Sequence, residues 1–347
     1  MSRDAALRVG VLSYPMLFQA RGGLQIQVLE SVAALRALGV EARLLDPARE
    51  KLADFDLIHV FAAINGNHRL VEYARAFELP VVLSPLIRPF WTRSLGWRAR
   101  LIENIAYRLS GGEVRTEYRQ IASALGSADR LIALGERERQ SIVEAFRIPA
   151  ERVRVIGNGI PDRFFAAEPA LFVERTGIAR GFVLNVAAIN PHKNQLGLAR
   201  ALAPLQVPLV VIGQCLPGDA DYLRALQAQP NVRYLGPVEY DDPLLAAAYA
   251  AAGVFCLPSH DEVMPLTTLE ALAADTPVVM TRHHAMDLSR LGGLIAEVVP
   301  QDEAAIRTVV ARALESPPAA GRCREAAREY SWREVGRRIK AVYEELV

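Results

Sequence analysis

Residues 253–282, GVFCLPSHDEVMPLTTLEALAADTPVVMTR, decide the fold class of this chain. A short apolar run at each end predicts a buried strand, and Leu266, Leu269 and Leu272 recur between them at helical spacing. Pro265 suits the first position of that helix, because its missing N–H costs nothing there. A strand, a helix and a second strand in this order predict two parallel strands with a helix packed across them.

The same alternation runs through most of the chain. A first series of six apolar runs begins with LRVGVL at Leu7, and a second series of five begins with FVLNVAAI at Phe182. A stretch rich in Pro, Glu and Ala at residues 166–180 separates the two series and predicts a linker. Because 347 residues exceed what one hydrophobic core usually supports, we expect an α/β fold of two doubly wound Rossmann-like domains, residues 1–165 and 166–330.

Composition excludes several classes of protein. The net charge is +1, and no run of Lys or Arg forms a patch that would follow a phosphate backbone, so we expect no nucleic-acid partner. The three cysteines are single and widely spaced, which predicts a reducing compartment. No apolar run reaches the 18 residues typical of a membrane span, and no signal peptide is evident. We therefore expect a cytoplasmic protein, soluble or peripheral to the membrane.

Three loops at predicted strand ends carry the candidate binding residues, because open α/β sheets bind ligands at that edge. Gly22 and Gly23 open a helix, where backbone N–H groups can approach an anion. Lys193 follows another strand, where it can pair with a phosphate. Glu262 precedes the helix of the opening stretch and Glu270 lies inside it among apolar residues, so it needs a partner such as a sugar or ribose hydroxyl.

Each of these signals also has a structural interpretation. The glycine pair also fits a tight turn, and Lys193 fits a solvated surface residue. Glu270 fits a charge near the N-terminus of a helix, and Glu262 fits a solvated loop residue. The Asp219 and Asp221 pair has metal-binding spacing but favours helix capping. His59 and His68 are more typical of packed core residues, whereas His192, beside Lys193, is more typical of a binding-site residue.

Taken together and in order, these stretches resemble one family. The glycine loop, NVAAINPHKNQ, PSHDEVMPLTTLEALAADTPVV and the tail YSWREVGRRIKAVYEEL are similar to the retaining glycosyltransferases of family 4, or glycosyl transferases group 1, which have the GT-B fold. The resemblance covers nearly the whole chain. Its most specific element is a pair of glutamates separated by seven intervening residues, which falls on Glu262 and Glu270.

The resemblance implies a role for each candidate residue. It implies that Glu262 contacts the hydroxyls of the transferred sugar, that Glu270 contacts the nucleotide ribose, and that Lys193 neutralises the leaving phosphate. Lys193 and Glu262 would be the catalytic residues. It also implies a GT-B cleft and a C-terminal helix, residues 331–347, that packs back on the N-terminal domain. The remaining residues that we expect to bind the donor are Gly22, Gly23, His192, Met264, Pro265, Leu266 and Thr267.

The sequence departs from the family pattern at several positions. Ala188 stands where an arginine usually completes a basic pair with the lysine, so His192 is expected to supply the missing charge. The segment Val263 to Pro265 replaces a glycine-rich turn, and Asp275 replaces a common glycine. A histidine that many relatives carry near Leu86 is absent, which leaves the acceptor site of the N-terminal domain undefined.

The expected function is that of a retaining glycosyltransferase, and the expected type is a hexosyltransferase. It would move a sugar from a nucleotide-diphosphate sugar to a glycan or lipid-linked acceptor in cell-surface polysaccharide or glycolipid biosynthesis, with no metal and no cofactor. Two alternatives stay open: a nucleotide-sugar epimerase of the same fold, and a non-catalytic nucleotide-sugar-binding module.

Residues 88–109, RPFWTRSLGWRARLIENIAYRL, combine arginines with Phe90, Trp91 and Trp97. Basic and aromatic residues on one helix are typical of a membrane interface, and they are equally typical of an ordinary helix with an exposed basic face. The first interpretation predicts peripheral contact with an anionic membrane.

Overall fold

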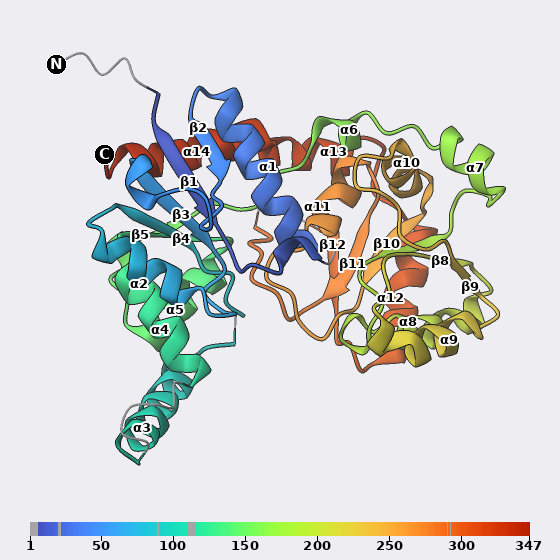
Figure 1. The fold of residues 1–347 in the computed structure, drawn as a ribbon. Helices are drawn as coiled ribbons and strands as arrows, with labels where there is room; N and C mark the ends of the chain where they lie inside the picture. The colour runs from blue at the N-terminus through green and yellow to red at the C-terminus, as the bar shows by residue number, and fades with distance from the viewer. Residues whose placement is uncertain (1–5, 20–21, 89, 110–115, 290, 292) are drawn as a thin grey trace. The chain divides into compact units, whose positions relative to one another are not determined.

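The computed structural model describes residues 6–19, 22–88, 90–109, 116–289, 291 and 293–347. Its contacts divide the chain into two compact units (Figure 1). Unit 1 consists of Met1–Gly159 with Trp332–Val347, and unit 2 is Ile160–Ser331. Each unit is built around one parallel sheet, as the alternation of apolar runs and helical patterns predicts.

Unit 1 contains a six-stranded sheet of order β2-β1-β3-β4-β5-β6 in which every strand pair is parallel. The central strands are buried along their length, as expected when helices cover both faces of a parallel sheet. Its strands are β1 (Arg8–Leu12), β2 (Glu41–Leu44), β3 (Leu57–Phe61), β4 (Val81–Ser84), β5 (Arg130–Ala133) and β6 (Val153–Val155). Its helices are α1 (Gly23–Ala37), α2 (His68–Ala76), α3 (Arg93–Leu109), α4 (Glu117–Ser127), α5 (Glu136–Phe146) and α14 (Trp332–Glu344).

Unit 2 contains a second six-stranded parallel sheet, of order β12-β11-β10-β7-β8-β9. Its strands are β7 (Val183–Val186), β8 (Leu209–Ile212), β9 (Val232–Tyr234), β10 (Val254–Leu257), β11 (Val278–Thr281) and β12 (Ile295–Val298). Its helices are α6 (Asp162–Phe165), α7 (Ala170–Thr176), α8 (Gln195–Leu202), α9 (Ala220–Gln227), α10 (Pro243–Ala251), α11 (Leu266–Ala273), α12 (Glu303–Glu315) and α13 (Arg322–Ala327). The expected α/β fold of two doubly wound halves is confirmed.

One strand of unit 2 was not expected. The apolar runs predict five strands in the second half, whereas β12 adds a sixth at the edge of the sheet beside β11. Ala296 and Glu297 on this strand are only partly buried or exposed. A single polar residue in a four-residue run removes the continuous apolar pattern by which a buried parallel strand is recognised.

The division between the units also differs from the expected boundary at residues 165 and 166. Unit 2 begins at Ile160, whose N–H donates to the carbonyl of Tyr330 at 2.6 Å. The stretch expected to be a linker contains α7, which packs on α10 of the same unit. Phe172 of α7 is fully buried, with its ring centroid 4.9 Å from that of Phe182. This aromatic pair makes residues 166–180 part of the packed unit.

The last helix, α14, lies in unit 1, beside α1 in Figure 1. A Cβ on Gly336 would lie 3.0 Å from the Cβ of Ala34, so the two helices approach closely because one residue lacks a side chain. Tyr343 anchors the other end of α14, since its hydroxyl lies 2.7 Å from Nδ1 of the buried His59 on β3. The chain thus returns to unit 1 after Ser331.

Candidate functional site

The candidate site of unit 2 lies at the point where the order of its strands reverses. The chain runs from β7 outward to β8 and β9 and then returns to β10 on the other side of β7. The loops that follow β7 and β10 therefore separate at the carboxyl edge of the sheet, which is where open α/β sheets bind their ligands. His192 and Lys193 belong to the first loop, and Glu262 belongs to the second.

Direct contacts hold these two loops together. The N–H of His260 donates to the carbonyl of His192 at 2.9 Å. The amide of Asn194 donates to the carbonyls of Pro258 at 3.3 Å and Pro300 at 2.8 Å, which ties the loop after β7 to two neighbouring loops. Asn194 adopts a left-handed conformation, φ 56°, which Asn tolerates better than most residues. Sequence reasoning missed this residue, although an Asn between a short turn and a helix is a recognisable signal.

Lys193 and Glu262 form an ion pair, with 2.6 Å between Nζ and Oε1. Their side chains are only 22% and 11% exposed. The Lys193 N–H donates to Oδ1 of Asn190 at 3.1 Å, so the turn that carries the lysine is itself capped. The structure therefore brings together the two residues expected to be catalytic. The interpretation of either one as a solvated surface residue is wrong.

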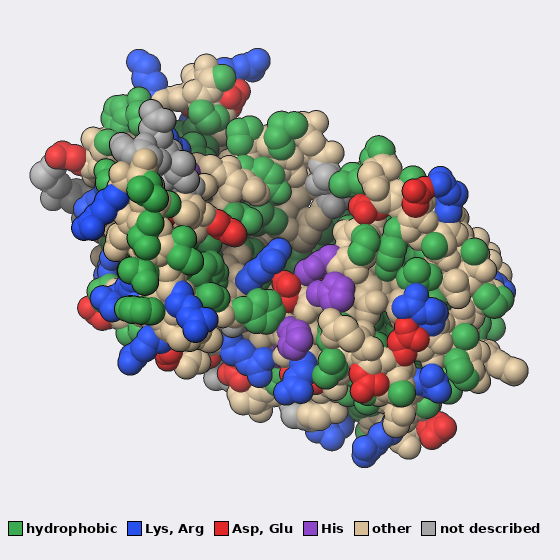
Figure 2. Space-filling model, turned by 90° about the horizontal axis from the view of Figure 1, so that it is seen from below, with side chains coloured by type: hydrophobic (Ala, Val, Ile, Leu, Met, Phe, Trp, Pro, Cys, Tyr) green, Lys and Arg blue, Asp and Glu red, His purple; other side chains and the backbone are tan. Residues whose placement is uncertain are grey.

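Histidines brace the loop that carries Glu262. His192 donates from Nε2 to the carbonyl of Asp261 at 3.1 Å, and His283 donates from Nδ1 to the carbonyl of His260 at 3.1 Å. The Glu262 N–H in turn donates to the carbonyl of His283 at 2.8 Å. Histidine side chains gather on the face shown in Figure 2. The sequence pattern predicts a role for His192 but not the contacts of His283, although His283 also follows a strand end.

Glu270 is buried within α11, with 2% of the residue exposed, and its Oε2 accepts a hydrogen bond from the Tyr249 hydroxyl at 2.8 Å. Burial raises the pKa of Tyr249 well above its usual value, and the Glu270 charge raises it further, so the hydroxyl remains a donor. The expectation that this carboxylate needs a hydroxyl donor is met by the protein. A ligand is therefore not required to explain its burial.

The start of α11 differs by one residue from the expectation. The helix begins at Leu266, and Pro265 precedes it as the N-cap with an extended conformation. The first-turn N–H groups, which include those of Leu266 and Thr267, have no acceptor within the helix and make its N-terminus favourable for an anion. Met264 is buried just before this turn. The four residues expected to line the donor, Met264 to Thr267, thus follow Glu262 in the same segment of the chain.

Two of the departures from the family pattern have a local explanation. Asp275 has φ 68°, the left-handed region that favours glycine, and its carboxylate accepts from the Gly321 N–H at 2.5 Å. The hydrogen bond offsets the conformational strain. Ala188 is exposed, and its carbonyl accepts from the buried Gln195 side chain at 2.9 Å. Its methyl group supplies no charge, so Lys193 and His192 are the basic groups of this loop.

The glycine pair lies at the corresponding strand reversal of unit 1, after β1. Gly23 begins α1, and Gly22 is its N-cap with φ −171°. A Cβ on Gly22 would meet no atom within 4 Å, and its extended backbone is open to any residue. Packing and conformation therefore do not require glycine at position 22. Ala20 and Arg21 of the same loop lie outside the described residues.

The remaining candidates lie elsewhere. Asp219 occupies the N-cap position of α9 without a side-chain hydrogen bond there, and Asp221 pairs with Arg224. In the described part of the chain, no group of three His, Cys, Asp or Glu side chains is arranged to hold a metal ion. His59 and His68 are buried, as expected for core residues.

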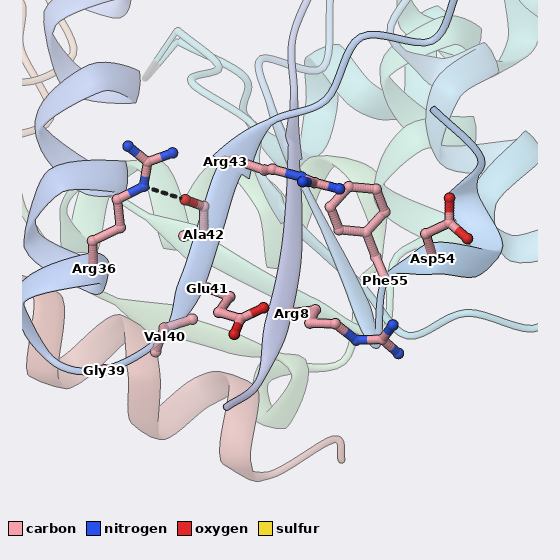
Figure 3. Close-up of a pocket in the computed structure, with 9 residues that line it drawn as sticks. All are labelled: Arg8, Arg36, Gly39, Val40, Glu41, Ala42, Arg43, Asp54 and Phe55. Atoms are coloured by element: carbon pink, nitrogen blue, oxygen red, sulfur yellow. Dashed lines mark hydrogen bonds between the residues drawn. The ribbon is translucent and has the colours of Figure 1, made fainter. Parts of the chain in front are cut away.

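A cavity of about 460 Å³ lies in unit 1 beside the edge strand β2 (Figure 3). Its basic groups already have partners within the protein. Arg8 pairs with Asp56 at 2.6 Å, Arg43 pairs with Glu50 at 2.8 Å, and Arg36 donates to a backbone carbonyl at 2.6 Å. It also lies away from the carboxyl ends of the strands. We therefore place the candidate site at the Lys193 loop.

Comparison with known proteins shows what this region is similar to. Residues 180–316 match the model of the glycosyl transferases group 1. The chain is 29% identical over 252 residues to D-inositol 3-phosphate glycosyltransferase of Kineococcus radiotolerans, which covers 67% of this chain and 55% of that protein. It is 25% identical to phosphatidyl-myo-inositol mannosyltransferase of Mycobacterium leprae over 97% of this chain and 96% of that protein. The chain thus spans about half the length of the first relative.

Solved structures share the fold. Sucrose-phosphate synthase of Thermosynechococcus elongatus superposes with a TM-score of 0.75 at 19% identity, covering 99% of each chain. Anabaena HepE, solved in complex with UDP and glucose, gives a TM-score of 0.66 at 18% identity, covering 98% of this chain and 100% of that chain. At these identities the likeness shows the fold alone, and it confirms the expected GT-B class.

Proposed function

We propose that this chain transfers a sugar, with retention of its anomeric configuration, from a nucleotide-diphosphate sugar to a glycan or lipid-linked acceptor. Through residues 180–316, the chain belongs to the glycosyl transferases group 1. The observation that carries the proposal is the Lys193–Glu262 pair, at 2.6 Å, beside the N-terminus of α11. Lys193 and the helix N–H groups can bind a diphosphate, and the Glu262 carboxylate can accept hydrogen bonds from sugar hydroxyls.

The proposed chemistry is mainly electrostatic. The bond between the anomeric carbon and the phosphate oxygen breaks, the acceptor oxygen bonds to the same face of that carbon, and the leaving phosphate takes the acceptor proton. Lys193 and the first turn of α11 stabilise the charge that develops on the phosphate. Glu262 orients the sugar, and Glu270 contacts the ribose, as the family resemblance implies. The reaction needs no metal and no cofactor.

The acceptor and the cellular location are part of the proposal. Two of the relatives are named as an O-antigen chain mannosyltransferase and a phosphatidyl-myo-inositol mannosyltransferase. These names support a glycan or lipid-linked acceptor in cell-surface polysaccharide or glycolipid synthesis. Cys215, Cys256 and Cys323 are unpaired, which supports a cytoplasmic site of action. The acceptor class further implies contact with the inner face of an anionic membrane.

The proposal is tested first by a thermal-shift screen against nucleotide sugars. A ligand at about 100 times its dissociation constant stabilises the folded state by about 2.7 kcal/mol, which raises the melting temperature measurably. The nucleotide sugar that gives the largest shift is then offered with glycan and lipid-linked acceptors. No shift with any nucleotide sugar and no turnover would overturn the proposal. Conversion of one nucleotide sugar into another would identify an epimerase, and binding without turnover would identify a binding module.

Lys193→Ala provides the residue-specific test. We expect turnover to fall about 100- to 1,000-fold, as when one stabilising donor is removed from an active site, while the melting temperature changes little. Arg200→Ala is the matched control, because it breaks another ion pair of unit 2, Arg200 to Glu303 at 2.7 Å, on the surface. Equal activity of the two variants, or a collapse in the melting temperature of Lys193→Ala alone, would make Lys193 a structural residue.

A further inference from the structure

Helix α3 of unit 1 projects beyond the sheet of that unit, as Figure 1 shows. It has 17 residues and is therefore about 25 Å long. Only Gly96 and Glu103 are buried along it, which is unusual for a helix of this length in a packed unit. Most of its surface thus faces away from the protein.

Two contacts fix which face of α3 is turned inward. A Cβ on Gly96 would lie 2.4 Å from the Ala145 carbonyl oxygen, so the helix rests directly on the backbone of α5. Glu103, seven residues further along the helix, accepts a hydrogen bond from the N–H of Thr116 at 3.2 Å. Both residues lie on the same side of the helix, because seven positions make about two turns.

The opposite side of α3 is apolar and exposed. Trp97, Ile102 and Leu109 are 57%, 61% and 84% exposed. We call this surface the outer face and define it by Leu95, Trp97, Leu101, Ile102, Ile105 and Leu109, all of which are exposed. Contiguous apolar surface of this kind marks a site of interaction with another molecule or a membrane.

The charge of α3 indicates what that partner is. Residues 93–109 contain four arginines and one glutamate, and the glutamate is the buried Glu103. Arg98 and Arg108 are exposed and lie along the outer face. A second copy of the chain that docked by the same face would bring these arginines against their equivalents, which is unfavourable. An anionic surface complements them.

The expectation for residues 88–109 is corrected in one respect. Trp91 does not belong to the outer face, because its ring packs 5.6 Å from Tyr118 and 5.2 Å from Phe146, against the core of unit 1. Trp97 is the tryptophan that reaches the surface. A Trp91 substitution would therefore report on folding and not on membrane contact.

We propose that the outer face of α3 binds an anionic lipid bilayer. Its apolar side chains enter the interfacial layer to a depth of about 5–10 Å, and Arg98 and Arg108 contact lipid phosphates. None of the helices in the described part of the chain has the length and apolar content that crossing a bilayer requires. The further step, from a bilayer to a lipid-linked acceptor, rests on the proposed function.

The test is sedimentation of the full chain with vesicles of phosphatidylcholine alone and of phosphatidylcholine with about one third phosphatidylglycerol. We expect binding to the anionic vesicles at low salt and its release at about 1 M salt, where the screening length falls to about 3 Å. Trp97→Ala should weaken binding, and Arg98→Glu should weaken it at least about fivefold, because each basic residue near the surface contributes about 1 kcal/mol.

Matched controls come from α2 of the same unit. Tyr73→Ala removes an aromatic ring that is 64% exposed, and Arg69→Glu reverses an exposed arginine. Both should bind vesicles like the wild type, and all four variants should keep the wild-type melting temperature. Equal loss in the α2 and α3 variants, equal binding to neutral vesicles, or no binding at low salt would overturn the proposal.

Two further measurements separate the alternatives. A concentration-dependent dimer in ultracentrifugation that Trp97→Ala abolishes would show that a second copy covers the outer face, and would overturn the membrane assignment. Donor turnover is measured in the same samples without vesicles. Turnover without vesicle binding would contradict only the proposed membrane contact. Vesicle binding without donor binding would contradict only the proposed sugar transfer.

Discussion

At the scale of single residues, the site combines groups whose charges are already compensated within the protein. Lys193 pairs with Glu262, and the hydroxyl of Tyr249 donates to Glu270. A ligand that uses these groups must compete with the existing partners or share them. Lys193 and Glu262 are partly exposed and can exchange partners, whereas Glu270 is 2% exposed, so a ribose hydroxyl would have to share its carboxylate with Tyr249. The two glutamates of the family pattern therefore differ in accessibility.

The Tyr249–Glu270 bond leads to a prediction about stability. Tyr249→Phe removes a hydroxyl donor from a buried carboxylate, so we expect the free energy of unfolding to fall by about 1–3 kcal/mol. Tyr234→Phe is the matched control, because its hydroxyl donates at 2.9 Å to the neutral carbonyl of Gly213 and should cost less. Chemical denaturation of both variants measures the difference. Equal losses would mean that Glu270 does not depend on this donor.

At the scale of elements, a buried carboxylate joins two loops at the carboxyl edge of the sheet of unit 1. Glu138, on α5, is fully buried and accepts from the N–H groups of Ile87 at 2.8 Å and Leu134 at 2.7 Å. Ile87 follows Leu86, which has φ 50°. A leucine in this region is strained, and the hydrogen bond from the next residue helps to hold it. Leu86 is also the position near which the family resemblance leads us to expect a histidine.

Glu138 should make the stability of unit 1 depend on pH. Burial raises its pKa from 4.5 to about 7, and the two backbone N–H groups offset only part of that rise. The folded chain therefore binds this proton more tightly than the unfolded chain, and the stabilisation is lost as pH rises from about 4.5 through 7. We expect the unfolding free energy of the wild type, relative to Glu138→Gln, to fall by up to about 3 kcal/mol between pH 5 and 8.

Denaturation at several pH values checks this prediction. Glu136→Gln is the control, because Glu136 lies in the first turn of the same helix but is exposed and pairs with Arg139. Its free energy of unfolding, measured at the same pH values, is the baseline for the Glu138→Gln comparison. A difference for Glu138→Gln that stays constant, or that grows with pH, would contradict the assignment of the raised pKa to this group.

At the scale of the whole molecule, the chain enters unit 2 at Ile160 and returns to unit 1 at Trp332. Removal of residues 332–347 should therefore destabilise unit 1 and leave unit 2 unaffected. The deletion exposes His59, whose pKa burial lowers to about 3, so this imidazole should titrate close to its usual value of about 6.5. Differential scanning calorimetry should show that only the unfolding transition of unit 1 moves to a lower temperature. NMR titration should measure the pKa of His59.

The outcome that would contradict this organisation is a deletion that lowers both transitions equally, or none. A milder variant gives an internal check. Tyr343→Phe keeps the helix but removes the hydroxyl that lies 2.7 Å from His59. We expect it to lower the same transition by a smaller amount, of order 1 kcal/mol, because only one hydrogen bond is lost.

The sequence by itself determined the fold class and the candidate residues, because apolar periodicity, strand-end glycines and the glutamate spacing are local patterns. It placed Lys193 and Glu262 in separate loops, but only the tertiary structure paired them, since the order of strands in a sheet is set by long-range packing. Packing also decided that Glu270 has a tyrosine partner, that Trp91 is turned inward while Trp97 is exposed, and that β12 completes the second sheet. These outcomes depend on residues distant in sequence, whose contacts no local pattern records.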